Sequence, residues 1–162
     1  AIAEYVGGSE EAFVNMMNRR AQELMANGTH FMNPHGLHDD NHYTTAYDLY
    51  LIFNECIKHE DFVNIIQSEA YTAYYTDVDG NSQEVLFTPT NLYAQGEVDV
   101  PENVTIVGGK TGTTDEAGYC LILMEKDSSD NPYISIVMGA SEKPVLYEDM
   151  TSLIEAIPSG QQ

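Results

Sequence analysis

Basic residues are scarce in this 162-residue chain, which has 6 Lys and Arg against 26 Asp and Glu and a formal net charge of -20. An electrostatic field of this sign repels nucleic-acid phosphates and anionic lipid surfaces. The composition therefore excludes nucleic acid as an expected partner.

Long apolar runs are also missing. No segment approaches the roughly 18 apolar residues that a membrane-spanning helix needs, and no basic stretch followed by an apolar core marks a signal peptide. The chain opens on AIAEYVGG, without Met or a polar lead-in. We expect residues 1–6 to be the end of a helix that begins upstream, with Gly7 and Gly8 as its stop.

Only two cysteines are present, Cys56 and Cys120, and they lie far apart in the sequence. They form no Cys-x-x-Cys pair, no zinc-ligand spacing and no dense disulfide framework. Buried free thiols are the expected state, and a single disulfide stays open at this point.

Hydrophobic spacing and turn residues predict an α+β fold. Ser9 caps a helix to about Met25, Thr45 caps another to about His59, and EDFVNIIQS forms a further short helix. Residues 29–44 and 88–103 are expected to be loops. Residues 69–87 are expected to form two strands around the turn DVDGNS.

The last third of the chain predicts an antiparallel sheet packed with helices. VTIVGGKT, GYCLILMEK and YISIVMGA are strand-like runs joined by short turns, so the sheet has at least three strands over residues about 104–139. A closing helix follows, whose expected apolar side carries Leu146, Met150, Leu153, Ile154 and Ile157. Residues 1–162 are interpreted as one partial domain.

The Gly-Lys-Thr at residues 109–111 raises the question of a phosphate-binding loop. Such a loop needs a glycine five residues before the Gly-Lys pair and a helix after it. Val104 stands at the required glycine position, and a turn and a strand follow. The phosphate-loop interpretation fails, which leaves a bulge with a solvated Lys110, or a strand edge that binds another ligand.

The wider segment GGKTGTTDEAGYCL resembles the third motif of the serine D-alanyl-D-alanine carboxypeptidases, a branch of the penicillin-binding proteins. Residues 8–49, with Thr-His-Phe, His-Gly-Leu and His-Tyr-Thr-Thr-Ala-x-Asp-Leu, resemble the stretch that follows the family's Ser-x-Asn motif. TNLY resembles its Asn-x-Leu-Leu segment. Nearly the whole chain is covered in order, so the resemblance implies an incomplete penicillin-binding-protein or β-lactamase-like domain.

The resemblance implies roles for four consecutive residues. Lys110 and Thr111 would bind the terminal carboxylate of a peptide lying along the strand, and Gly112 would let that peptide's backbone approach. Thr113 would offer its backbone N–H to the oxyanion hole, although some members carry His there. Lys143 is the basic residue nearest to another family position, and it receives no role. The resemblance implies no cofactor and no metal.

The chain lacks the expected nucleophile. None of its four lysines has a Ser three residues earlier, so no Ser-x-x-Lys is present. A literal Ser129-Asp130-Asn131 follows the third motif, whereas the family places its copy before it, and the polar surroundings predict a hairpin turn instead. We expect the nucleophile, its lysine base and the functional Ser-x-Asn upstream of Ala1, and we expect this chain alone to be inactive.

The parent protein implied by the resemblance removes the terminal D-alanine from peptidoglycan stem peptides ending in D-Ala-D-Ala through an acyl-enzyme, and β-lactams would inhibit it. Its substrate would place it outside the cytoplasm, in the cell envelope. The missing part would cover apolar surface, so we expect either that the chain alone self-associates or that a partner segment covers this face.

Three rival interpretations stay open. One is a β-lactamase or glutaminase relative, and a second is a non-catalytic cell-wall binding module. The third is a metal site in the histidine-rich loop, where His30, His35, His38 and His42 have none of the familiar ligand spacings. The resemblance accounts for His30, His35 and His42 as residues that bond locally to the backbone.

Overall fold

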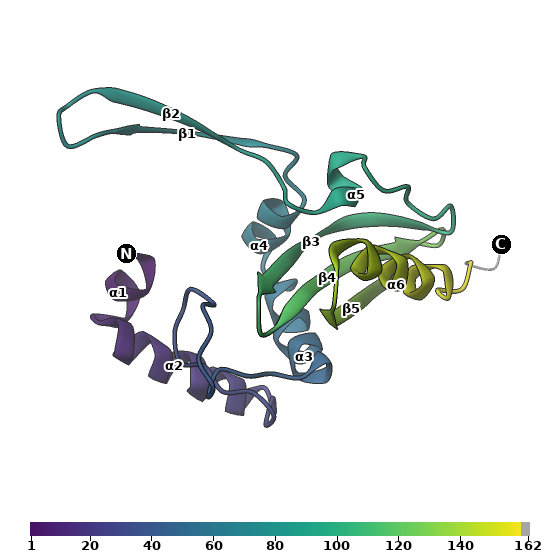
Figure 1. Cartoon of the computed structure of the whole chain (residues 1–162), viewed down its shortest axis with the longest axis horizontal. Coiled ribbons are helices and arrows are strands. Elements are labelled where there is room, and N and C mark those ends of the chain that lie inside the picture. The colour runs from purple at the N-terminus through teal and green to yellow at the C-terminus, as the bar shows by residue number, and fades with distance from the viewer. Residues whose placement is uncertain (160–162) are drawn as a thin grey trace.

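The computed structural model describes residues 1–159, which form helices around two separate antiparallel sheets (Figure 1). The helices are α1 (Ile2–Gly7), α2 (Glu10–Glu23), α3 (Ala46–Cys56), α4 (Glu60–Ile66), α5 (Leu92–Gln95) and α6 (Lys143–Glu155). The strands are β1 (Tyr71–Thr76), β2 (Ser82–Phe87), β3 (Val104–Thr114), β4 (Gly118–Asp127) and β5 (Pro132–Ala140). The α+β prediction is confirmed.

The larger sheet has the order β3-β4-β5, and both pairs of neighbours are antiparallel. Alternate residues of the central strand β4 are buried, which is the pattern of a strand with one face in a core. Leu121 and Leu123 on that face pack with Met150 and Ile154 of α6. The three predicted strands and the closing helix are therefore confirmed, and α6 covers one face of the sheet (Figure 1).

The prediction for the buried side of α6 is wrong at one residue. Leu153 is 42% exposed, whereas Tyr147 is buried and accepts a hydrogen bond at its Oη from the Leu92 backbone N–H at 3.0 Å. Successive helix residues turn by about 100°, and the buried side is centred near Met150, so Leu153 lies at its margin. Tyr147, which the prediction did not include, lies at the other margin of the buried side.

The predicted helix starts are confirmed by their caps. The Ser9 Oγ accepts a hydrogen bond from the Ala12 N–H at 3.1 Å, and the Thr45 Oγ1 accepts one from the Asp48 N–H at 3.1 Å. The ends come earlier than expected: α2 stops at Glu23 and α3 at Cys56.

The predicted loop over residues 88–103 contains a helical turn, so that prediction is wrong in part. Asn91 is buried, and its Oδ1 accepts a hydrogen bond from the Tyr93 N–H at 3.1 Å, which starts α5. The Tyr93 ring packs against Tyr147 with ring centroids 5.4 Å apart. Tertiary burial of one aromatic residue thus stabilises a helix too short to show periodicity.

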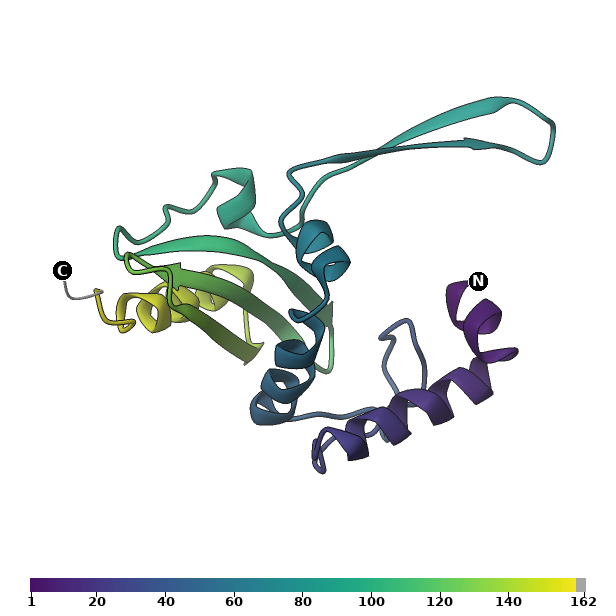
Figure 2. The ribbon, with the colours of Figure 1, turned by 180° about the vertical axis from the view of Figure 1, so that it is seen from behind.

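Strands β1 and β2 form a two-stranded hairpin that projects away from the main sheet (Figures 1 and 2). The predicted turn is confirmed: the Asp77 carboxylate accepts hydrogen bonds from the backbone N–H groups of Asp79 and Asn81 and from the Gln83 amide. These hydrogen bonds lower the pKa of Asp77.

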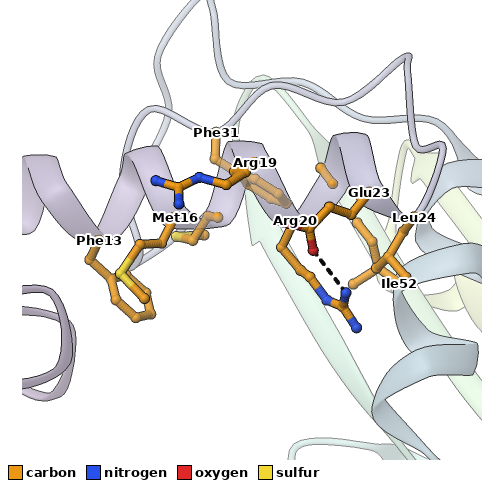
Figure 3. Close-up of a pocket in the computed structure, with 10 residues that line it drawn as sticks. Phe13, Met16, Arg19, Arg20, Glu23, Leu24, Phe31 and Ile52 are labelled. Atoms are coloured by element: carbon orange, nitrogen blue, oxygen red, sulfur yellow. Dashed lines mark hydrogen bonds and ion pairs between the residues drawn. The ribbon is translucent and has the colours of Figure 1, made fainter.

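Helices α1 and α2 lie apart from the sheet, on the far side of α3 (Figure 2). An open groove of about 500 Å³ lies beside α2, lined by apolar side chains that include Phe13, Met16 and Ile52 (Figure 3). At its end, Arg20 pairs with Glu23 at 2.9 Å and with Glu55 at 2.6 Å. Within residues 1–159, no helix has the length and apolar character needed to span a bilayer.

Glu125 of β4 is unusual, because it is an ionisable residue whose side chain is fully buried. Within residues 1–159, neither carboxylate oxygen makes a hydrogen bond of normal geometry. Burial raises the pKa of Glu125 to about 7, although the nearby Ser135 hydroxyl offsets part of the rise.

We predict that Glu125→Gln makes stability less dependent on pH. The unfolded chain releases this proton near its ordinary pKa of 4.5 and the folded chain only near 7, so the folded state loses up to about 3 kcal/mol as the pH rises through that window. Urea unfolding at pH 5 and pH 8 measures the loss. A Gln variant that loses as much as wild type between these pH values, relative to the surface control Glu148→Gln, contradicts the prediction.

Candidate functional site

Strand β3 is an edge strand that carries the Lys-Thr-Gly segment. It pairs with β4 on one side, and its other edge pairs with no strand among residues 1–159. A register shift between Ile106 and Gly108 marks a bulge in this strand. A bulge, one of the alternatives that the sequence left open, is therefore present just before Gly109, and it lies beside the Lys-Thr-Gly segment.

Backbone packs closely against β3 at two glycines, with the end of α4 at Gly108 and with the neighbouring strand β4 at Gly109. A Cβ on Gly108 would lie 2.2 Å from the Ile66 carbonyl oxygen, and a Cβ on Gly109 would lie 2.1 Å from the Ile122 carbonyl oxygen. Neither position has space for a side chain, so glycine at both is required by close backbone approach.

The second half of the edge is open. Lys110, Gly112 and Thr113 are exposed, and a Cβ on Gly112 would meet no atom within 4 Å. The Lys110 ammonium donates a hydrogen bond to the carbonyl of Thr111. All four residues assigned from the sequence therefore lie in a row on one accessible strand edge, which can accept an extended peptide.

Thr111 has a partner that the sequence did not indicate. Its Oγ1 lies 2.5 Å from the Oγ1 of Thr90, a residue of the segment between β2 and α5. The two residues are 21 positions apart, and only the folding of that segment against β3 joins them. No periodicity or motif spacing could have predicted the contact.

The strand context also decides against a phosphate-binding loop. Lys110 lies within β3, and the chain continues through a turn into β4. A phosphate-binding lysine would instead lie where a loop opens into a helix.

The histidine-rich loop is held by local bonds, as expected from the resemblance. The Nδ1 atoms of His30, His35 and His42 lie within hydrogen-bonding distance of the backbone of Asn41, Leu37 and Met32, at 2.7, 3.2 and 3.1 Å. Partial burial is the main cause that lowers the pKa of His42. No group of three or more potential metal ligands occurs in residues 1–159.

This loop approaches the turn between β3 and β4. His38 Nδ1 lies 3.9 Å from a carboxylate oxygen of Glu116, and its Nε2 lies 3.3 Å from Asp40. The loop thus lies beside the open end of the β3 edge.

The literal Ser129-Asp130-Asn131 is a hairpin turn, as predicted. The Asp127 carboxylate accepts hydrogen bonds from the backbone N–H groups of Ser129 and Asn131, and Asp130 has a positive φ of 64°. Together with the Asn131 amide, these bonds lower the pKa of Asp127. The motif therefore has a structural explanation.

Both cysteines are free and half-buried, which answers the question of a disulfide. Burial raises the pKa of Cys56. Cys120 pairs with Gly112 across the two strands. Lys143 starts α6 and lines a separate groove with Leu92 and Tyr147.

The sequence of this chain matches a known protein family and several of its members. The model of the peptidase S11 family, described as D-alanyl-D-alanine carboxypeptidase, matches residues 1–142. The carboxypeptidase DacF of Bacillus subtilis is 32% identical over 157 residues, which cover 96% of this chain and 37% of DacF. The carboxypeptidase DacA of Haemophilus influenzae is 31% identical over 139 residues, which cover 86% of this chain and 32% of DacA.

Solved structures show the same arrangement. The Streptomyces K15 DD-transpeptidase matches with a TM-score of 0.79 and 25% identity, covering 90% of this chain and 53% of that one. The carboxypeptidase DacD of Francisella tularensis matches with a TM-score of 0.78 and 25% identity, covering 96% of this chain and 46% of that one. The chain thus spans about half or less of the proteins it matches.

The helices and antiparallel sheet define a DD-peptidase fold of the penicillin-binding-protein class. The chain belongs to the peptidase S11 family of D-alanyl-D-alanine carboxypeptidases.

We predict that Gly108→Ala destabilises the chain, whereas Gly112→Ala does not. The new methyl group at residue 108 would overlap the Ile66 carbonyl, and overpacking of this kind costs about 1–3 kcal/mol. At residue 112 the methyl group meets open space. Thermal unfolding of the two variants measures the difference, and equal melting temperatures would show that the contact between α4 and β3 is not rigid.

Proposed function

We propose that this chain is part of a serine-type D-Ala-D-Ala carboxypeptidase and supplies the strand that binds the substrate. The observation that carries the proposal is the unpaired edge of β3 at residues 110–113, which follows the close approach of α4 to Gly108. A peptidoglycan stem peptide ending in D-Ala-D-Ala lies along this edge as an added strand.

Two side chains recognise the peptide's terminal carboxylate. The Lys110 ammonium, which now bonds to the Thr111 carbonyl, turns to the carboxylate, and the Thr111 hydroxyl donates to the same group. A hydrogen bond to a charged group contributes about 1.5–3 kcal/mol. β-Lactam antibiotics that carry a carboxylate would use the same pair, which explains their proposed role as inhibitors.

The remaining positions serve the reaction at the penultimate residue. Gly112 lets the peptide backbone approach, and the backbone N–H of Thr113 stabilises the oxyanion that forms when a serine attacks the carbonyl. The peptide bond then breaks, the leaving D-alanine takes a proton on its amine, and water hydrolyses the resulting ester. Loss of one oxyanion-hole donor costs about 2.7–4 kcal/mol of transition-state stabilisation.

The attacking serine and its lysine base come from a segment outside these residues, because the sequence contains no Ser-x-x-Lys. The isolated chain is therefore proposed to be inactive. Since the substrate is part of the cell wall, the parent protein is proposed to act in the cell envelope.

We predict that Lys110→Ala in the full-length protein lowers kcat/KM for release of D-alanine from a stem-peptide mimic by roughly 10- to 200-fold. Because the lost contact is to the carboxylate, a substrate with a C-terminal amide should show little further loss in the variant. Lys126→Ala is the matched control, since Lys126 lies on the neighbouring strand and pairs with Asp130.

A fluorescent penicillin completes this experiment. The full-length protein should form a covalent adduct, and the isolated chain should form none. No release of D-alanine by the full-length protein, or an adduct on the isolated chain, contradicts the proposed function. Rapid turnover of penicillin in place of release would identify a β-lactamase relative.

The isolated chain is further proposed to self-associate. Large apolar side chains of α1 and α2 are exposed, among them Ile2, Tyr5, Val6 and Met16, and Met16 lines the groove of Figure 3. A second copy is the expected occupant of this surface. The negative charge opposes association, so screening by salt should favour it.

Light scattering at increasing protein concentration and at two salt concentrations measures this behaviour. We expect the mean mass to exceed 18.0 kDa and to rise with salt. A monomer at high concentration in both buffers contradicts self-association.

A further inference from the structure

A second groove adjoins the proposed carboxylate site, at the amino-terminal end of the Lys-Thr-Gly segment. Its volume is about 360 Å³, and Gly109 and Lys110 form one side of it. The end of α4, the base of the hairpin and the segment that leads to α5 form the rest. The groove is therefore continuous with the edge to which the proposed function assigns the substrate.

The lining is apolar with one charge. Ile65, Tyr71, Phe87 and Pro89 provide apolar surface, and Lys110 is the one charged residue that lines the groove. Tyr71 and Phe87 face each other across β1 and β2, and both side chains are more than half exposed. An apolar group bound in this groove would lie beside the Lys110 ammonium, and no Asp or Glu lines the groove.

The walls of this groove are fixed by hydrogen bonds. The Thr90 and Thr111 hydroxyls lie 2.5 Å apart, and the Gln95 amide donates to the Pro89 carbonyl at 2.6 Å. On the opposite side, the Ile66 carbonyl packs on Gly108. These contacts fix the wall formed by Pro89 and Thr90 against β3, and Tyr71 and Phe87 at the hairpin base complete the groove.

The direction of the substrate decides which part of it meets the groove. In the proposed function the terminal carboxylate lies at Lys110 and Thr111, and the reacting carbonyl lies at Thr113. The peptide thus runs antiparallel to β3, with its last residue nearest to Gly109. The residue that leaves in the reaction is the one beside the groove.

We infer that this groove is a subsite for the side chain of the leaving residue, and that the enzyme releases D-amino acids with large apolar side chains as well as D-alanine. A methyl group is about the size of a water molecule, whose share of the liquid is roughly 30 Å³, so D-alanine fills a small part of the groove. A side chain such as that of D-leucine or D-phenylalanine buries apolar surface against Tyr71 and Phe87. The reaction is the same hydrolysis, with the larger D-amino acid as the leaving amine. The inference rests on the proposed function.

The test compares the full-length protein on two peptides that differ only in the last residue, D-Ala-D-Ala and D-Ala-D-Leu. We expect kcat/KM for D-leucine release to equal or exceed that for D-alanine release. Tyr71→Ala should lower the ratio of the two constants about fivefold or more. Ala70→Phe should lower it as well, because the larger side chain fills the groove from another side.

Tyr74→Ala is the matched control, since Tyr74 lies on the same strand, is exposed, and is not part of the groove lining. It should leave both constants and their ratio unchanged. Release of D-alanine with a D-leucine rate more than tenfold lower, unaffected by either groove variant, overturns the inference and leaves the proposed function standing. Failure to release D-alanine at all overturns both.

Discussion

The contact between the Ile66 carbonyl and Gly108 determines where α4 lies against β3, and so where a peptide could pair with this strand. It brings the end of α4 onto the edge of β3 so closely that no side chain fits, and it coincides with the bulge that re-aims the strand. Helix α4 therefore closely approaches β3 at Gly108, whereas a Cβ at Gly112 would meet no atom within 4 Å. A peptide that pairs with the open part has one defined place for its carboxyl end. The register of the proposed substrate thus follows from backbone packing that lies outside the motif itself.

Charge is the basis of the selectivity proposed for this edge. The chain carries a formal net charge of -20, so an anionic peptide is repelled by most of its surface. Lys110 supplies a positive charge on the open edge, and it also lines the groove next to it. A local cation in an acidic protein favours a ligand whose negative charge is at one end, which describes a peptide with a free carboxyl terminus.

Much of the fold could be predicted from sequence because the signals are local. Ser9 and Thr45 cap their helices through hydrogen bonds to residues three positions further along the chain. The three strands are runs rich in β-branched residues between turns. The turn at Ser129-Asp130-Asn131 could also be predicted, because its polar neighbours in the sequence are typical of turns. The site residues were found through the resemblance around Lys-Thr-Gly, and the structure places them together on one edge. Their chemical roles remain proposals.

What the sequence could not provide depends on contacts between distant segments. Helix α5 is stabilised by the packing of Tyr93 on Tyr147, 54 residues away in the chain. The contact between Thr90 and Thr111 and the groove at the hairpin base arise from the same folding of the segment after β2. The exposure of Leu153 shows a similar limit, because the margin of a buried helix face depends on what packs against it.

Binding of a carboxylate-ended peptide at the β3 edge can be measured without any catalysis by NMR spectroscopy of the isotope-labelled chain. The chain is titrated with an acylated D-Ala-D-Ala peptide and with the same peptide ending in an amide. We predict that the backbone amide signals of Thr111, Gly112 and Thr113 shift with the carboxylate peptide and much less with the amide. Shifts that are equal for the two peptides, or that appear elsewhere and spare this edge, would contradict it.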